Sequence, residues 1–387
     1  MSKLWPLALL LLVGAGLSGL WWIASRTAPP DGAAVPSDVS DARPAGDYVG
    51  TPTCAECHPE NAALYAHSGH AHTFAFTKDS KLARQLDGRT FRDAARGTQF
   101  LYSFDRNGLA VEIPSKLDGG RFGVTYALGS GTHAVTFLTL MRDEDGQPLG
   151  VEHRASYYRS LRGLGITPGQ QNVPPPSQDV QFFGKLVTGH DLERCIECHT
   201  TTGTIVGQHI QNLRPNVGCE CCHGPGRTHT EAARHDGDTA AFAVEARWPT
   251  AESELRTCGR CHRLPEMLTK TELSRKSKIL VRLQPVGLMQ SECYRQSNGR
   301  LRCTTCHNPH ERTSTDSARY EHICLDCHTA PKSTPCPINP RTQCLTCHMP
   351  GLRVNASIFH DHWIRIRRDD DPKPVAPPPT PRRKQAP

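Results

Sequence analysis

Aromatic residues make up only 6% of this 387-residue sequence, and only five residues are methionine. Aromatic side chains normally contribute a large share of the apolar area that a core buries. With so few of them, the side chains alone would build only a thin hydrophobic core. A bound apolar cofactor would supply the missing volume.

The chain also lacks a basic run interleaved with aromatic residues, which a nucleic-acid site would need. Its formal net charge of +7 at pH 7 therefore does not predict a nucleic-acid partner. A charged prosthetic group would change this balance, because the negative carboxylates of a cofactor would offset the positive charge of the chain.

Cysteine, in contrast, is abundant: 14 of the 17 cysteines lie in seven copies of the pattern Cys-x-x-Cys-His. Each copy is the attachment signal for a c-type haem, in which two thiols bond to the porphyrin and the histidine binds the iron. Structural zinc also uses Cys-x-x-Cys pairs, but it needs no histidine after every second cysteine. The predicted haem-binding residues are Cys54, Cys57, His58, Cys195, Cys198, His199, Cys219, Cys222, His223, Cys258, Cys261, His262, Cys303, Cys306, His307, Cys324, Cys327, His328, Cys344, Cys347 and His348. The sequence thus predicts seven covalently attached haem c groups.

The N-terminal residues predict a location outside the cytoplasm. Leu4 to Ala24 is an uncharged stretch of 21 residues that follows Lys3, and a helix of that length can span a bilayer. We expect residues 1–24 to be a retained membrane anchor, with a cleaved signal peptide as the alternative. Residues 25–46, rich in Pro, Ala, Asp and Ser, would form a flexible linker. Because haem c is attached outside the cytoplasm, we expect the protein on the periplasmic side of the bacterial inner membrane.

The seven motifs are unevenly spaced along the chain. Residues 47–180 hold only one and form a first-haem region, whereas residues 181–366 hold six and form a haem-dense region. The spacing has no fixed period, which excludes a solenoid repeat. Apolar residues alternate on both sides of Asn107-Gly108, which predicts a hairpin within a small antiparallel β element at about 98–140. We expect an otherwise mostly α fold with long loops, organised around stacked haems, and a disordered tail at 367–387.

Thirteen histidines outside the motifs could bind the irons from the opposite face. An iron with histidine on both faces is suited to electron transfer, whereas an iron with one open face can bind a substrate. Sequence context favours six distal ligands: His70, His133, His190, His229, His310 and His362. For the seventh iron, His322, His360 and an open coordination position are the main candidates, and the lesser ones are His67, His72, His153, His209 and His235. The small number of methionines argues against a general scheme of histidine and methionine ligation, with Met141, Met267 and Met289 left as single exceptions.

On these residues the chain resembles the multihaem cytochrome superfamily of cytochrome c-554 and hydroxylamine oxidoreductase. The resemblance is carried by SGHAHTFAF (68–76), LGSGTHAVTFL (128–138), CECCHGPGRTH (219–229), CTTCHNPHE (303–311) and DHWIRI (361–366). It implies a mostly helical fold with stacked and perpendicular haem pairs and histidine on both faces of the irons. It also implies His70, His133, His229, His310 and His362 as distal ligands. The chain departs from these relatives in having seven motifs and no Cys-x-x-Cys-Lys, the active-site signature of pentahaem nitrite reductases.

Three cysteines lie outside the motifs: Cys221, Cys293 and Cys336. In an oxidising compartment a disulfide between Cys293 and Cys336 is a reasonable hypothesis. We expect Cys221 to be buried beside a haem.

The favoured function is a membrane-tethered electron-transfer relay. Its partners would be a quinol-oxidising donor, a reductase or soluble cytochrome as acceptor, and the inner membrane through the N-terminal helix. The alternative is an oxidoreductase with one open-coordinate haem that acts on hydroxylamine, nitrite, tetrathionate or a similar small nitrogen or sulfur compound. A structural subunit of a larger haem assembly is a third, less favoured hypothesis.

Overall fold

The computed structural model describes residues 45–114, 116–172, 174, 176–235, 248–329, 336–338 and 341–375. The predicted anchor at 1–24 and nearly all of the predicted linker at 25–46 lie outside these residues. Within the described part of the chain, no helix combines the length and the apolar character needed to cross a membrane.

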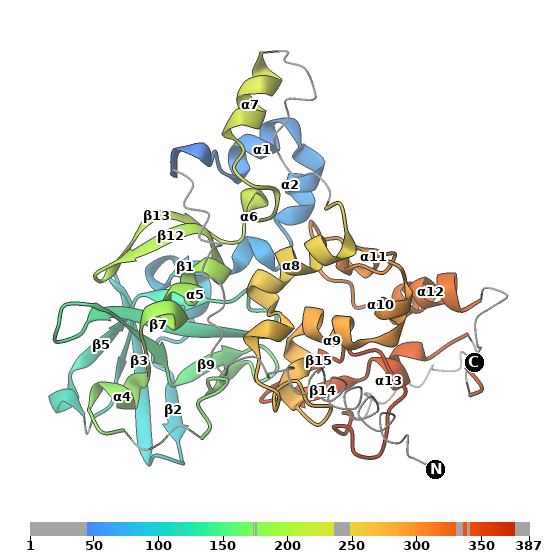
Figure 1. Cartoon of the computed structure of the whole chain (residues 1–387). Helices are drawn as coiled ribbons and strands as arrows, with labels where there is room; N and C mark the ends of the chain where they lie inside the picture. Colours follow the sequence, from blue (N-terminus) through green and yellow to red (C-terminus); the bar gives the residue numbers. More distant parts are fainter. Residues whose placement is uncertain are drawn as a thin grey trace, which may run out of the picture. The chain divides into compact units, whose positions relative to one another are not determined.

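Two antiparallel sheets occupy residues 74–187 (Figure 1). The larger one has the strand order β1-β6-β7-β8-β11, formed by Phe74–Phe76, Tyr126–Leu128, Ala134–Arg142, Pro148–His153 and Gly184–Val187. Strand β9 (Ala155–Tyr158) pairs with β7 and with β10 (Gly163–Ile166). The smaller sheet has the order β2-β3-β4-β5, formed by Thr90–Asp93, Thr98–Asp105, Gly108–Glu112 and Arg121–Val124. We call residues 74–187 the β part.

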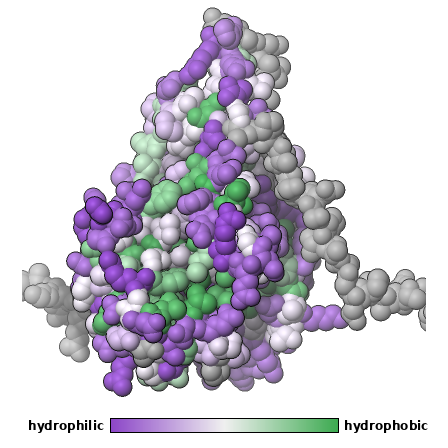
Figure 2. All heavy atoms as spheres, turned by 90° about the vertical axis from the view of Figure 1, so that its left-hand side faces the viewer, coloured by the Kyte–Doolittle hydropathy of each residue, from purple (hydrophilic) through white to green (hydrophobic). Residues whose placement is uncertain are grey.

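The predicted hairpin around Asn107-Gly108 corresponds to β3 and β4, with Tyr102 opposite Val111. Alternate residues of each strand point to one face of a sheet, so the apolar positions of both sheets can meet. Phe100 and Val111 from the smaller sheet and Phe137 and Val151 from the larger one are fully buried in one hydrophobic cluster. The two sheets therefore share a core. The face of the β part in Figure 2 mixes hydrophilic and hydrophobic side chains.

The expectation of a mostly α fold is wrong. The structure is 36% helical and 25% strand, with several antiparallel sheets. The expected β element at 98–140 covered only the strands with clear alternation. Strands such as β9 and β11 are four residues long and give too little sequence for a period to show. His153, the last residue of β8, and Arg154, which lies between β8 and β9, are polar or charged yet buried, which breaks the apolar pattern that marks a strand.

Short helices and two small hairpins form the rest of the chain (Figure 1). The helices that carry or precede the cysteine motifs are α1 (Thr51–Cys57), α5 (Gly189–His199), α6 (Cys219–His223), α8 (Ala251–His262), α11 (Cys303–Cys306), α12 (Ser317–His328) and α13 (Cys344–His348). Between them lie α2 (Pro59–Tyr65), α7 (Arg227–Arg234), α9 (Gln284–Gln290) and α10 (Glu292–Gln296). The hairpins pair β12 (Thr200–Val206) with β13 (His209–Pro215) and β14 (Gly351–Val354) with β15 (Ser357–His360). Within the β part, α3 (Lys81–Arg84) and α4 (Val180–Phe183) are single turns.

The segment 361–371, which we call the C-terminal strap, is held by buried ion pairs. Arg365 contacts Asp361 at 3.0 Å and Asp371 at 3.1 Å, and Arg275 contacts Asp371 at 2.7 Å. The Asp371 residue is only 6% exposed. Farther on, the Val375 N–H donates to the Gly351 carbonyl at 2.9 Å. The first part of the predicted disordered tail is thus packed against the protein, and residues 376–387 lie outside the described residues.

Candidate haem-binding sites

Each cysteine motif lies at the C-terminal end of a helix. In five copies the motif histidine is the last helical residue, while His58 and His307 directly follow α1 and α11. Their backbone N–H groups still donate to the first cysteine of the motif, at 2.9 Å for His58 and 3.0 Å for His307. Residues three and four apart lie on the same helix face, so both thiols and the histidine of one motif point to one side. This is the arrangement that attachment to a single porphyrin requires.

Four of the motif histidines face a second imidazole. The ring centroids are 6.3 Å apart for His58 and His229, 6.4 Å for His262 and His70, 6.0 Å for His223 and His310, and 6.2 Å for His307 and His362. A metal–imidazole nitrogen distance is about 2 Å, so two imidazoles on opposite sides of one metal have centroids about 6 Å apart. The spacing of all four pairs therefore fits an iron between the two rings.

The orientation of several rings is fixed through their Nδ1 atoms. Nδ1 lies 3.1 Å from the Thr73 carbonyl in His199, 3.2 Å from Gln284 Oε1 in His262, 3.2 Å from the Arg365 carbonyl in His348 and 2.9 Å from the His360 carbonyl in His362. An Nδ1–H that donates to an oxygen leaves the lone pair on Nε2 free for a metal.

Burial favours the neutral form of these imidazoles. It is the main cause that lowers the pKa of His70, His199, His262, His307 and His310, and it lowers the pKa of His362 to about 4. Neutral imidazole is the form that binds a metal, so no proton must be displaced near neutral pH. The environment of these residues therefore fits a haem iron.

The other predicted distal ligands do not form such pairs. The ring of His133 lies 4.4 Å from Phe359 and borders a cavity of about 430 Å³ that Arg159 and Arg353 also line. His190 is exposed at the start of α5, and His322 is exposed on α12. Exposed His360 has its Nδ1 2.9 Å from the Met349 carbonyl.

The motif histidines His199 and His348 differ from the four paired ones in what faces their rings. Among the described residues, no second imidazole faces His199 or His348 at the spacing of the four pairs. Within the described part of the chain, no imidazole is thus placed to act as the second ligand opposite His199 or His348.

Motifs that are distant in the sequence meet through their thiols. The thiol of Cys54 lies near that of Cys219 and interacts with it, as do the thiols of Cys198 and Cys261 and those of Cys258 and Cys303. Cys222 interacts electrostatically with Cys258 and Cys261, and Cys324 with Cys306 and Cys344. In space the first motif therefore adjoins the third and the third adjoins the fourth. The second and the fifth both adjoin the fourth, and the sixth and seventh continue from the fifth.

The three cysteines outside the motifs form no disulfide bond with one another. Cys293 instead interacts electrostatically with Cys306 of the fifth motif and with Cys324 and Cys327 of the sixth. The expected bond between Cys293 and Cys336 is thus absent here. Cys221 is half-buried rather than buried, and desolvation raises the pKa of its thiol to about 11.

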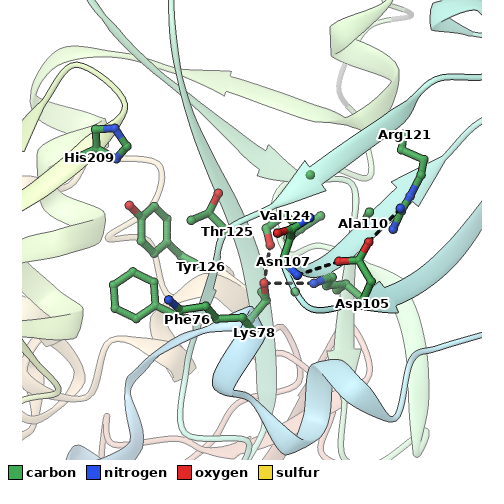
Figure 3. Close-up of a pocket in the computed structure, with 14 residues that line it drawn as sticks. Phe76, Lys78, Asp105, Asn107, Ala110, Arg121, Val124, Thr125, Tyr126 and His209 are labelled. Carbon is green, nitrogen blue, oxygen red and sulfur yellow. Dashed lines mark hydrogen bonds and ion pairs between the residues drawn. The ribbon is translucent and has the colours of Figure 1, made fainter.

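A second cavity, of about 400 Å³, lies in the β part (Figure 3). Phe76, Tyr126, Lys78 and His209 line one side of it, and the ion pair of Asp105 with Arg121 lines the other. Its lining includes no motif residue and none of the six favoured distal histidines, although it includes His209, a lesser candidate for the seventh iron.

A match to a known protein family supports this interpretation of the motifs. Residues 178–224, which include the second and third motifs, match the family described as cytochrome c554 and c-prime. The chain is also similar to a solved structure, the outer cell wall cytochrome OcwA, with a TM-score of 0.48 and 14% identity over 82% of this chain and 80% of that one. No curated protein sequence matches it. The family match and the motifs support a multihaem c-type cytochrome with covalently bound haem c and a role in electron transfer.

Proposed function

We propose that this chain is a heptahaem c-type cytochrome that works as an electron-transfer relay. The observation that carries the proposal is the set of four imidazole pairs, each with one motif histidine and one distal histidine at the spacing of a six-coordinate iron. An iron with two imidazole ligands has no position for a substrate and cycles between its oxidation states with little rearrangement.

The contacts between motifs support the relay. Each motif adjoins at least one other through a thiol. A haem on each motif would bring its attached edge close to that of the next, and short distances between rings favour electron transfer. The proposed path runs from the first motif through the third and fourth to the fifth, sixth and seventh, with the second as a branch at the fourth.

The proposal includes the cellular setting predicted from the sequence. The uncharged stretch from Leu4 to Ala24 would tether the protein to the inner membrane, with the haem-bearing part on the periplasmic side. The donor would be a quinol-oxidising protein, and the acceptor a reductase or a soluble cytochrome. We also propose that the chain is related to the cytochrome c-554 and hydroxylamine oxidoreductase superfamily, on the quoted motifs.

A second candidate is an oxidoreductase with an open-coordinate haem. It is favoured by His199 and His348, which face no imidazole at the spacing of the four pairs among the described residues. The cavity lined by His133, Arg159 and Arg353 has cationic side chains that suit a small anion such as nitrite or tetrathionate.

Two measurements on the purified mature protein test these candidates. A pyridine haemochrome assay should give seven haem c groups per chain, and a smaller number would contradict the heptahaem proposal. Paramagnetic resonance of the oxidised protein then counts the high-spin irons. A wholly low-spin spectrum that cyanide leaves unchanged supports the relay. A high-spin component that cyanide converts to low-spin supports the oxidoreductase instead.

A further inference from the structure

Glu254 is a buried carboxylate that connects the fourth and fifth motifs. It lies on α8, one turn before Cys258, and its side chain is 1% exposed. Its oxygens accept the backbone N–H of Thr304 at 2.8 Å and the Thr304 hydroxyl at 2.9 Å. Thr304 directly follows Cys303, so this one side chain fixes the fifth motif against the helix of the fourth.

Glu220 makes the same kind of connection between the third motif and the first. It lies between Cys219 and Cys221, and the residue is 5% exposed. Its oxygens accept the backbone N–H groups of Val49, Gly50 and Gly226, each at 2.8 Å. Gly50 is the N-cap of α1, the helix of the first motif.

Both glutamates lie where two motifs meet through their thiols. Glu254 acts electrostatically on Cys258 and Cys303, which contact each other. Glu220 acts on Cys54, which contacts Cys219. Each carboxylate is thus close to the attachment points of two neighbouring porphyrins.

The negative charge of Glu254 is not needed for its hydrogen bonds. In a glutamine at this position, Oε1 can accept the Thr304 N–H while Nε2 donates to the Thr304 hydroxyl oxygen. A buried charge is costly unless it is well compensated. The nearest cation to Glu254 is Arg302, whose Nη1 is 4.0 Å away and whose side chain is 30% exposed. A buried charge that is dispensable for structure but lies beside two cofactors suggests an electrostatic role.

We propose that Glu254 and Glu220 are positioning residues that hold neighbouring haems at a fixed separation and lower their reduction potentials. A ferric haem carries one more positive charge than a ferrous haem, so a nearby buried carboxylate stabilises the oxidised state. Glu254 would act on the fourth and fifth haems, and Glu220 on the first and third. This inference rests on the proposed attachment of haem to the motifs.

The test compares Glu254→Gln with Glu252→Gln in the full-length holoprotein. Glu252 lies two residues away on the same helix, but its side chain is 63% exposed and pairs with Arg256 at 3.1 Å. In a spectroelectrochemical titration, Glu254→Gln should raise the potential of one or two haems. At a fixed potential this lowers their ratio of oxidised to reduced iron by about tenfold, which is 59 mV for one electron. Glu252→Gln should leave every potential in place. Both oxygens of Glu220 accept backbone N–H groups, so Glu220→Gln removes at least one hydrogen bond together with the charge. It should raise the potentials of a different subset of haems.

The outcomes separate this inference from the proposed function. If the wild-type protein carries no haem, the proposed function fails. If Glu254→Gln keeps seven haems and low-spin spectra but titrates like Glu252→Gln, the inference is wrong. Glu254→Ala, which removes the hydrogen bonds to Thr304 as well as the charge, should also change the magnetic coupling between two haems. If it keeps the wild-type coupling, the positioning role is excluded.

Discussion

The imidazole rings of His223 and His310 lie 6.0 Å apart with an angle of 3° between their planes. His223 belongs to the third motif, whereas His310 follows the fifth. The other three pairs likewise join segments that are distant in the sequence. An iron between each pair would therefore link two such segments, and the loss of one ligand should destabilise both of them.

His70 and His72 provide a test of these pairs. His70 faces His262 at 6.4 Å, while the Nε2 of exposed His72 lies 2.9 Å from the Ala66 carbonyl. His70→Ala should convert one low-spin iron to high-spin, because it removes a sixth ligand. His72→Ala should not change the spin state. Paramagnetic resonance of the two oxidised variants checks this, and an unchanged spectrum for His70→Ala would rule out its assignment as a distal ligand.

Gly287 should be intolerant of a side chain. A Cβ at this buried position of α9 would lie 2.7 Å from the backbone nitrogen of Trp363 and 2.9 Å from the carbonyl carbon of His362. Gly287→Ala should push the C-terminal strap away and destabilise the protein by about 1–3 kcal/mol, as overpacking generally does. Because the strap carries His362, a high-spin signal should accompany the loss of stability.

The control for this substitution is Gly123→Ala. Gly123 lies in β5, where an added Cβ would meet no atom within 4 Å. Thermal unfolding followed by absorbance should show a lower midpoint for Gly287→Ala alone. Equal midpoints for the two variants would mean that the strap does not pack on α9 as described.

Asp371 should contribute to the acid stability of the strap. Burial alone would raise its pKa, but the Arg368 N–H and the guanidinium groups of Arg275 and Arg365 lower it to about 2. A carboxyl with a depressed pKa stabilises the fold above its unfolded pKa, and this contribution is lost as the pH falls through the folded pKa. The wild type should therefore lose stability between pH 4 and pH 2. Asp371→Asn should be less stable at pH 7 but vary less over that window. Denaturation at several pH values measures both, and parallel curves would contradict the assignment.

Cys221 should be unreactive in the native protein. With its pKa raised to about 11 by burial, only about one thiol in ten thousand is ionised at pH 7, and the thiolate is the nucleophile. Iodoacetamide should modify Cys221 slowly before denaturation and readily after it, as peptide mapping can show. Cys221→Ser should retain the same number of haems as the wild type. Rapid modification of native Cys221 would instead indicate a reactive thiol.

The sequence allowed part of the fold to be predicted. The hairpin of β3 and β4 has clear alternation on both sides of Asn107-Gly108, and the structure contains it. The rest of the β part was missed because several strands are short and because Arg154, a buried partner of Asp93 between β8 and β9, interrupts the apolar pattern there. Tertiary burial overrides local propensity at such positions.

The positions of the candidate ligands were easier to predict than their partners. Four of the six favoured distal histidines face a motif histidine, but nothing local indicates which one, because the pairs form between distant segments. Glu220 could have been recognised from the sequence. The residue after the first cysteine is small or apolar in five motifs: Ala55, Ile196, Gly259, Leu325 and Leu345. The two exceptions, Glu220 and Thr304, both take part in the buried connections between motifs.

Both hydrophobic clusters of the structure are built mainly from the β part, with Leu192 and Ile196 from α5. The helices from α8 onward have no such cluster among the described residues. One portion of the chain thus has a hydrophobic interior that its own side chains form. That portion could fold before haem is attached. The cysteine motifs on the other helices would then still be accessible for haem attachment. Folding of the remaining helices would then follow haem attachment, next to a portion that is already folded.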